Sequence, residues 1–409
     1  MPQAYLDHQA ATPALPEVVE AMRPYWNEAY GSASSLHQHG LRARDALAKA
    51  REQIAAFINA ASPDEIIFTS DGTESANLAV KGTAWASQRR GQHVVTSAIE
   101  HPSVLGSLEF LEQQGFACAR VQVDAQGFID PATVRAALTD ETILVALHHA
   151  NPDIGTIQPV KEFAAATAEG GTPLFIDAEA SAGWVPIDVQ EMGADLLSFS
   201  PYRFQGPKGL GVLYRQRRAR LTSLLHGGVQ EGGRRAGAEN VPAIVGAGLA
   251  AEIAGRRLEQ RSRHVERLQK RLWEGLQAQI PYLKLNGPPP GPGRLVSNLN
   301  VSIEFAEGEG LLLMLDTRGI AVASGTSCVS KSLRVSHVLS AIGLEHGLGQ
   351  AAILMSLGPD NTEEEIDYVL ETVPRIVTKL RAMSPLWDEF ERGVIDSSIA
   401  PRRSSGPGQ

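Results

Sequence analysis

The chain has 409 residues, more than a single hydrophobic core normally serves, and this length predicts two domains. Hydrophobic residues make up 43% and charged residues 20% of the sequence, which is typical of a soluble globular protein. The 46 acidic and 37 basic side chains give a formal net charge of −9, which argues against nucleic-acid binding. We find no signal peptide, no apolar stretch of membrane-spanning length, and only two cysteines, Cys118 and Cys328. We therefore expect a cytoplasmic protein with free thiols and no membrane partner.

Helical segments come first, within residues 15–60, and LRARDALAKAREQIAAFIN is the clearest amphipathic stretch. Short β-rich runs then alternate with helices, and the expected strands lie in EIIFTS, HVVTSA, ARVQV, TILVALHHA, PLFIDAEA, LLSFSP and GVLYR. This alternation predicts an α/β fold with a mostly parallel sheet and helices on both faces. Ligands of such sheets bind at the carboxyl ends of the strands.

The second half of the chain predicts a smaller α/β domain. A long charged helix, roughly 243–280, leads to the Pro/Gly-rich loop NGPPPGPGR, a strand in NLNVSIEF and a helix in GEGLLLMLDTRG. A last helix begins in NTEEEIDYVLETV, with Asn361 or Thr362 as its N-cap. We expect a large domain over residues 15–260. Residues 1–14 and 261–392 form a small domain that carries the Cys328 loop, and residues 393–409 form a disordered tail.

Residues at successive strand ends indicate a site for a phosphate-bearing cofactor. Gly72 and Thr73 lie between a strand and a helix start, where backbone N–H groups and a hydroxyl can hold a phosphate. His101 can stack on an aromatic ring, and Asp177 ends the run PLFID, where a carboxylate can pair with a pyridinium nitrogen. Ser200 ends the run LLSFS. Each residue alone is more often a turn, cap or packing residue, and only their joint placement favours a site.

The two cysteines lie in different surroundings. Cys328 is part of ASGTSCVSKS, a small and polar stretch that favours an accessible thiol in a loop. Cys118 is part of GFACARV, an apolar run that favours a buried and inert thiol.

The strand, helix and loop segments quoted above occur together with YGSASSLH, TSAIEHPSV, IDAEASAGWVPID, GPKGLGVLY and LHGG. With this combination, the chain resembles the cysteine desulfurases of iron–sulfur cluster assembly over nearly its whole length. The resemblance implies the class V aminotransferase family and fold type I of the pyridoxal-phosphate enzymes. It also implies a homodimer whose active sites lie at the subunit interface, within the large domain. In this family the residues matching Gly72, Thr73, His101, Asp177 and Ser200 form the cofactor pocket. The cysteine matching Cys328 carries a persulfide.

The sequence departs from the family at the cofactor. Active members bind pyridoxal phosphate as a Schiff base with a lysine in SFS-G-H-K, whereas this chain reads SFSPYR, with Tyr202 at the histidine and Arg203 at the lysine. Arginine stays protonated, so it offers no free amine to an aldehyde. Pro152 and Ala180 replace an asparagine and a glutamine that contact the cofactor ring, and Ala238 replaces a threonine that the neighbouring subunit donates to the phosphate.

Substrate contacts are replaced as well. Leu354 stands where the family has an arginine that clamps the substrate carboxylate, and leucine cannot make that bidentate contact. Ser32 replaces an asparagine that contacts the substrate.

These degenerate positions favour a pseudoenzyme: a homologue that has lost pyridoxal-phosphate-dependent desulfuration, with no covalent cofactor and only a remnant pocket. It would act in sulfur transfer or iron–sulfur cluster assembly with a scaffold or sulfur-carrier partner. Cys328 would then be a persulfide carrier or a ligand of a shared iron–sulfur cluster. Two alternatives stay open. One is an active cysteine desulfurase or lyase with noncovalently bound pyridoxal phosphate, which Asp177 and His101 favour. The other is a non-catalytic regulatory subunit of an active paralogue, which Ala238 counts against.

Overall fold

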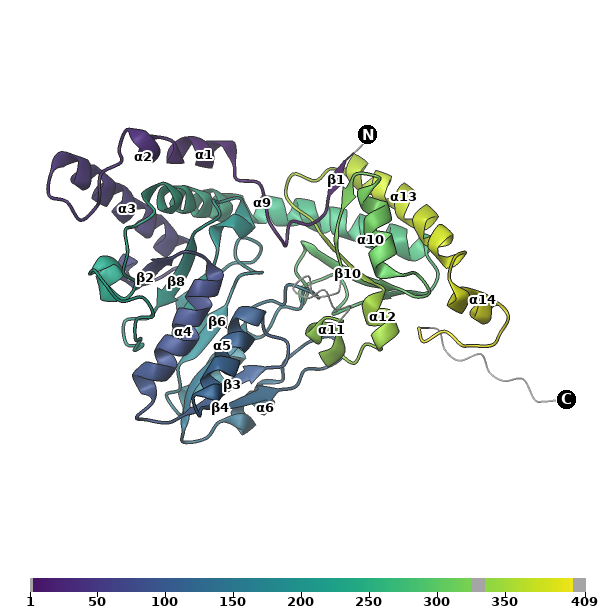
Figure 1. The fold of residues 1–409 in the computed structure, drawn as a ribbon, viewed down its shortest axis with the longest axis horizontal. Helices are drawn as coiled ribbons and strands as arrows, with labels where there is room; N and C mark the ends of the chain where they lie inside the picture. The colour runs from purple at the N-terminus through teal and green to yellow at the C-terminus, as the bar shows by residue number, and fades with distance from the viewer. Residues whose placement is uncertain (1–2, 325–334, 400–409) are drawn as a thin grey trace.

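The computed structural model describes residues 3–324 and 335–399. Two α/β parts lie side by side, and one long helix, α9 (Val241–Gln279), extends across both of them (Figure 1). The larger part is built on a seven-stranded sheet and the smaller part on a four-stranded sheet.

The large sheet has the strand order β2-β8-β7-β6-β5-β3-β4. Strand β8 is antiparallel to both of its neighbours, and the other pairs are parallel. The carboxyl ends of the remaining strands therefore meet at one edge of the sheet. The strands are β2 (Ile66–Thr69), β3 (His93–Ser97), β4 (Ala117–Val121), β5 (Thr142–His148), β6 (Leu174–Asp177), β7 (Leu196–Phe199) and β8 (Gly211–Arg215).

Helices cover both faces of this sheet, as the central strand β5 illustrates. Val145 and Leu147 pack in a core with α3 (Gln38–Phe57) and α9, while Leu144 and Ala146 pack on the opposite face with α4 (Gly72–Ser87) and α5 (Pro102–Gln113). A strand buried on both faces needs apolar residues at every position, which explains its uninterrupted hydrophobic run. The other helical elements here are α1 (Pro16–Met22), α2 (Pro24–Asn27), α6 (Pro131–Ala137), α7 (Val160–Ala168), α8 (Val189–Met192), η1 (Pro63–Glu65), η2 (Pro201–Phe204) and η3 (Gln230–Gly233).

The smaller part is an antiparallel sheet in the order β12-β13-β10-β9, packed against α9 and α13 (Glu363–Arg381). Its strands are β9 (Leu283–Leu285), β10 (Asn298–Ile303), β12 (Ala323–Ser324) and β13 (Ala352–Ser356), and β1 (Ala4–Tyr5) pairs with β11 (Ile320–Ala321) beside them. In β13, Ile353 and Met355 belong to the apolar core, so the alternation of a strand places Leu354 on the opposite face. The remaining helices are α10 (Gly308–Asp316), α11 (His337–Ala341), α12 (His346–Gln350) and α14 (Pro385–Glu391).

The fold-class prediction is confirmed: a mostly parallel sheet flanked by helices is joined to a small α/β domain. Thr362 is the N-cap of α13 and forms a reciprocal capping box with Glu365. The predicted domain boundary at residue 260 stays a prediction, and it falls inside the continuous helix α9. In the predicted tail, residues 393–399 are described, and the Ser397 hydroxyl donates to the Glu304 carboxylate at 2.5 Å. Within the described ranges, no helix is long and apolar enough to span a membrane.

Candidate active site

Four of the predicted site residues lie where the strand-end rule places them. Asp177 is the last residue of β6, and its neighbour in the sheet is His148, the last residue of β5. Ser200 directly follows β7, and Gly72 opens helix α4 just beyond β2. His101 is the N-cap of α5 after β3.

Glu179 joins three of these positions, two through its carboxylate and one through its backbone N–H. The Ser200 hydroxyl donates to Glu179 Oε1 at 2.6 Å and accepts the backbone N–H of Gly72 at 2.8 Å. The backbone N–H of Glu179 donates to Asp177 Oδ1 at 2.9 Å. A Cβ atom built on Gly72 would lie 1.4 Å from Glu179 Oε1, so only glycine lets the carboxylate approach this closely. The carboxylate therefore lies at the positive end of α4, where an anion is favoured.

Glu179 is the site residue that our sequence reasoning missed. The signal was its position two residues after Asp177, in the turn DAEA that follows a strand end. Burial raises the pKa of Glu179, and the adjacent Asp177 adds to that effect, while Arg203 opposes it. Arg203 Nε lies 3.4 Å from Glu179 Oε2, and both side chains are largely shielded from solvent, at 14% and 13% exposure.

Asp177 lies in a second group of buried polar side chains. It is 3% exposed, and burial raises its pKa to about 6, with the charge of Glu100 adding to the shift. Glu100 is fully buried, accepts the Ser97 hydroxyl at 2.5 Å and lies 2.8 Å from His148 Nδ1. A carboxyl group in such surroundings gains from a cationic partner, such as a protonated ring nitrogen.

His101 has a defined protonation pattern. Its Nδ1 accepts the backbone N–H of Ser103 at 3.2 Å and lies 2.7 Å from the Ser103 hydroxyl. Burial lowers the pKa of His101, so the ring is neutral at pH 7 and carries its proton on Nε2. Thr73, the second residue of α4, is exposed.

The replaced cofactor positions border a narrow cleft. Arg203 lies in η2 with its guanidinium 4.8 Å from the centroid of the Tyr202 ring. Ala180, Glu179 and Arg203 line a cleft that is too narrow for a water molecule. Its other walls are His8, Gln9, Trp184, Ser297 and Leu357. The Glu179 side chain thus lines this cleft and also occupies the anion position at the start of α4.

Two of the replaced residues, Pro152 and Leu354, are apolar and lie near β10, and a third, Ser32, lies at the surface. The Pro152 carbonyl accepts a hydrogen bond from Asn298 Nδ2 at 2.9 Å and so links the large part to β10. Leu354 is 7% exposed and pairs with Asn300 across the same sheet. Ser32 is exposed, and its hydroxyl accepts the N–H of Ser34 at 3.4 Å.

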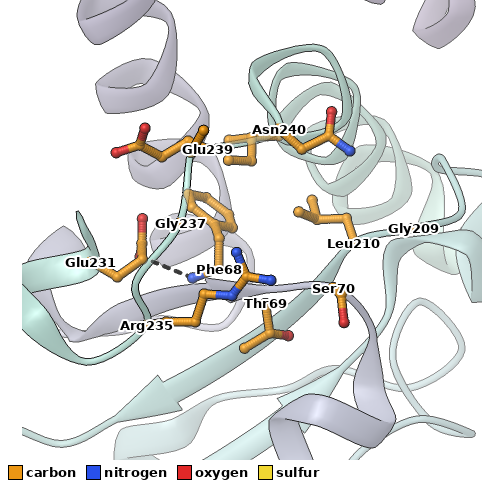
Figure 2. Close-up of a pocket in the computed structure, with 12 residues that line it drawn as sticks. Phe68, Thr69, Ser70, Gly209, Leu210, Glu231, Arg235, Gly237, Glu239 and Asn240 are labelled. Atoms are coloured by element: carbon orange, nitrogen blue, oxygen red, sulfur yellow. Dashed lines mark hydrogen bonds between the residues drawn. The ribbon is translucent and has the colours of Figure 1, made fainter. Parts of the chain in front are cut away.

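Ala238 lines a different pocket, of about 180 Å³, between the end of β2 and residues 231–240 (Figure 2). Glu231 holds this segment in place, because its carboxylate accepts from Arg51 at 2.7 Å and from the backbone N–H of Phe68 at 2.9 Å. Arg235 pairs with Glu74 in the first turn of α4 at 2.9 Å. The segment is therefore anchored to α3, β2 and α4.

Of the two cysteines, the structure describes Cys118 but not Cys328. Cys118 lies in β4, and burial raises its pKa to about 11, so it is not a thiolate at neutral pH. Cys328 lies outside the described residues. Among residues 3–324 and 335–399, no group of three or more His, Cys, Asp or Glu side chains has a metal-binding arrangement.

The fold and the strand-end site define a class of protein. The model of the aminotransferase class-V family matches residues 4–369, and the chain belongs to that family, within its cysteine desulfurase branch. It is 44% identical over 388 residues to a cysteine desulfurase IscS of Clostridium botulinum, covering 95% of this chain and 98% of the relative. A cysteine desulfurase IscS of Methanosarcina thermophila is 47% identical over 382 residues, with 93% and 94% covered. A solved NifS-like protein superposes with a TM-score of 0.87 at 34% identity, covering 93% of this chain and all of that one.

The comparisons correct one prediction. We expected a homologue that has lost desulfuration and acts only as a sulfur carrier or cluster-ligand partner. Relatives at 44–47% identity over almost the full length are named cysteine desulfurases, so that expectation is wrong. The alternative of an active cysteine desulfurase agrees better with these similarities.

Proposed function

We propose that this chain is an active cysteine desulfurase that binds pyridoxal phosphate without a covalent link. The observation that carries the proposal is the buried Asp177 carboxyl group at the end of β6, joined through Glu179 and Ser200 to the start of α4. A buried carboxyl group at this strand end is suited to pair with a pyridine ring nitrogen.

Two observations support the fit of this cofactor. Burial raises the pKa of Asp177 even with His148 and Arg203 nearby, and a pyridinium nitrogen would add a directly bonded positive partner. At the other end, the start of α4 already holds an anion, the Glu179 carboxylate, together with the Ser200 hydroxyl. The lysine position does not fit a Schiff base, because an arginine guanidinium offers no free amine to an aldehyde.

Each residue then has a definite task. Asp177 would hold the ring nitrogen, His101 would cover the ring face, and the Gly72 N–H, Ser200 and Arg203 would hold the phosphate. When bound, the cofactor supplies an electron sink for the substrate carbon. Because Nδ1 of His101 accepts the Ser103 N–H, its proton would be on Nε2.

We further propose that Cys328 accepts the sulfur. The overall reaction converts cysteine and the Cys328 thiol into alanine and a Cys328 persulfide. The carbon–sulfur bond of the substrate breaks, a sulfur–sulfur bond forms, and the thiol proton ends on the alanine methyl group, so no external oxidant or reductant is needed. A scaffold or sulfur-carrier protein of iron–sulfur assembly would then receive the sulfur.

We also propose a homodimer. Large apolar side chains are exposed on two segments of the large part, around α2 and just before η3: Trp26, Tyr30, Leu36, Leu225 and Val229. The second segment continues into residues 231–240, which line the pocket of Figure 2. A second copy covering these side chains would remove them from water. Light scattering at micromolar concentration should give twice the chain mass, and a monomer would contradict the proposal.

The test of the desulfurase proposal is product analysis. The purified chain, supplied with pyridoxal phosphate, cysteine and a thiol reductant, should release sulfide and alanine in equal amounts. Release should stop when the cofactor is omitted and in the variant Asp177→Ala. Alanine and sulfide at the rate of the cofactor alone would contradict the proposal.

A further inference from the structure

Glu179 occupies the place that a phosphate would take at the start of α4. Its Oε1 receives the Ser200 hydroxyl at 2.6 Å, and Ser200 in turn receives the N–H of Gly72 at 2.8 Å. Its Oε2 faces Arg203 Nε at 3.4 Å. A hydroxyl, a helix start and a guanidinium are the groups by which proteins bind phosphate, and here they surround a carboxylate of the same chain.

The position of this carboxylate is costly to the fold. The side chain is 13% exposed and lies beside the buried carboxyl group of Asp177. Two neighbouring buried carboxyl groups repel each other when both are ionised. A neutral side chain would satisfy the same turn, so the fold alone does not require a charge at residue 179.

The carboxylate and a phosphate exclude each other. The cleft beside Glu179, Ala180 and Arg203 is too narrow for a water molecule, and the space at Gly72 is filled by Oε1 to within 1.4 Å of a Cβ position. A phosphate at the α4 start would contact the same Ser200 hydroxyl and the same Arg203 side chain. It can enter only after the Glu179 carboxylate has moved away.

We propose that Glu179 is an internal competitor for the phosphate group of the cofactor. Its carboxylate closes the anion position in the free protein, and phosphate binding displaces it and transfers Ser200 and Arg203 from the carboxylate to the ligand. The proposal rests on the proposed cofactor, and it implies that the chain releases that cofactor more readily than it would without the carboxylate. The observed affinity for phosphate is then set by the difference in free energy between placing the phosphate and placing the Glu179 carboxylate at this position.

The experiment is calorimetric titration of the full chain with inorganic phosphate and with pyridoxal 5′-phosphate. Glu179→Gln keeps the size of the side chain and removes its charge, and Glu179→Ala also empties the space. Both variants should bind each ligand about tenfold more tightly or better, since loss of one charge-assisted interaction is worth about 1.5–3 kcal/mol and tenfold is about 1.4 kcal/mol. Unchanged affinity in both variants, within about twofold of the wild type, would overturn the proposal.

Two controls make the result specific. Pyridoxal, which lacks the phosphate, should bind the wild type and Glu179→Gln equally. Glu112→Gln removes a carboxylate near the end of α5, where it pairs with Arg120, and should leave phosphate affinity unchanged. Because the readout is phosphate binding, absence of cysteine turnover would count against the proposed function and not against the role of Glu179.

Discussion

The two sides of the site differ in chemistry. On the sheet edge, Asp177, Glu179 and Ser200 present charged and hydroxyl groups that are joined by short hydrogen bonds. On the side of the small domain, Leu354 and Leu357 are apolar and buried. Among residues 3–324 and 335–399, the first side carries groups that can bind a charged ligand, whereas Leu354 and Leu357 on the second side carry no charge. Under the proposed function, cofactor recognition would fall to the sheet edge and substrate recognition to the small domain, so one could change without the other.

The largest effect on sulfide release should come from a substitution at the sheet edge. Asp177→Asn should lower sulfide release by about 100-fold or more, because it removes the charge that keeps a ring nitrogen protonated. The same change should raise the free energy of unfolding of the cofactor-free protein at pH 7.5, by about 1–3 kcal/mol, since one pKa unit corresponds to about 1.36 kcal/mol. Chemical denaturation and a sulfide assay measure the two quantities.

The sign of the stability change follows from the raised pKa. In the folded protein Asp177 has a pKa of about 6, above its ordinary value of 3.8, so the fold favours the protonated form. Stability contributed by that protonation is present below pH 3.8 and is lost as the pH rises towards 6. The difference in the free energy of unfolding between Asp177→Asn and the wild type should therefore vanish near pH 3.8.

Asp367→Asn is the control for this stability change. Arg271 lowers the pKa of that exposed carboxyl group, so loss of the carboxylate should not stabilise the protein. A destabilised Asp177→Asn variant at pH 7.5 would refute this electrostatic account.

A positively charged side chain at position 354, on the apolar side of the site, should improve the binding of cysteine. Leu354→Arg should lower the KM for cysteine by about tenfold with little change in kcat, since a charged hydrogen bond to the carboxylate is worth about 1.5–3 kcal/mol. Leu354→Met, which keeps the size and adds no charge, should leave KM unchanged. Equal KM values for the arginine and methionine variants would show that substrate recognition lies elsewhere.

Removing the Ser200 hydroxyl, which lies between the start of α4 and the Glu179 carboxylate, should have a moderate effect on cofactor binding. Ser200→Ala should weaken the binding of pyridoxal phosphate by about 3- to 10-fold. The hydroxyl donates to the Glu179 carboxylate in the free protein and would donate to the phosphate in the complex, so only a net difference of about 0.5–1.5 kcal/mol is lost. Ser32→Ala, at an exposed position, should not change it. Fluorescence titration measures both affinities, and an unaltered affinity in Ser200→Ala would remove this hydroxyl from the phosphate site.

The smallest effect is expected at Cys118. Cys118→Ser should leave sulfide release unchanged, because a thiol with a pKa of about 11 does not act as a nucleophile at neutral pH. Peptide mapping after exposure to cysteine should find added sulfur on Cys328 alone. Persulfide on Cys118 would contradict this assignment.

The sequence predicted the sheet edge better than it predicted the function. Asp177, Ser200 and Gly72 could be placed because parallel strands bring their carboxyl ends to one edge, whatever the side chains do beyond it. Glu179 could not, because a glutamate in a turn is usually solvated, and only the hydrogen bonds through Ser200, directly after β7, join its carboxylate to Gly72. The functional prediction failed because it weighed single replacements such as Arg203 and Leu354 more heavily than the likeness of the whole chain.

Borohydride reduction during turnover tests the central claim most directly. The chain is incubated with pyridoxal phosphate and cysteine, sulfide is measured, and borohydride is then added before the intact mass is determined. The account predicts sulfide release by a protein whose mass is unchanged after reduction, because no lysine of the chain holds the cofactor. A reduced cofactor attached to a lysine such as Lys208, or a protein that releases no sulfide under these conditions, would contradict it.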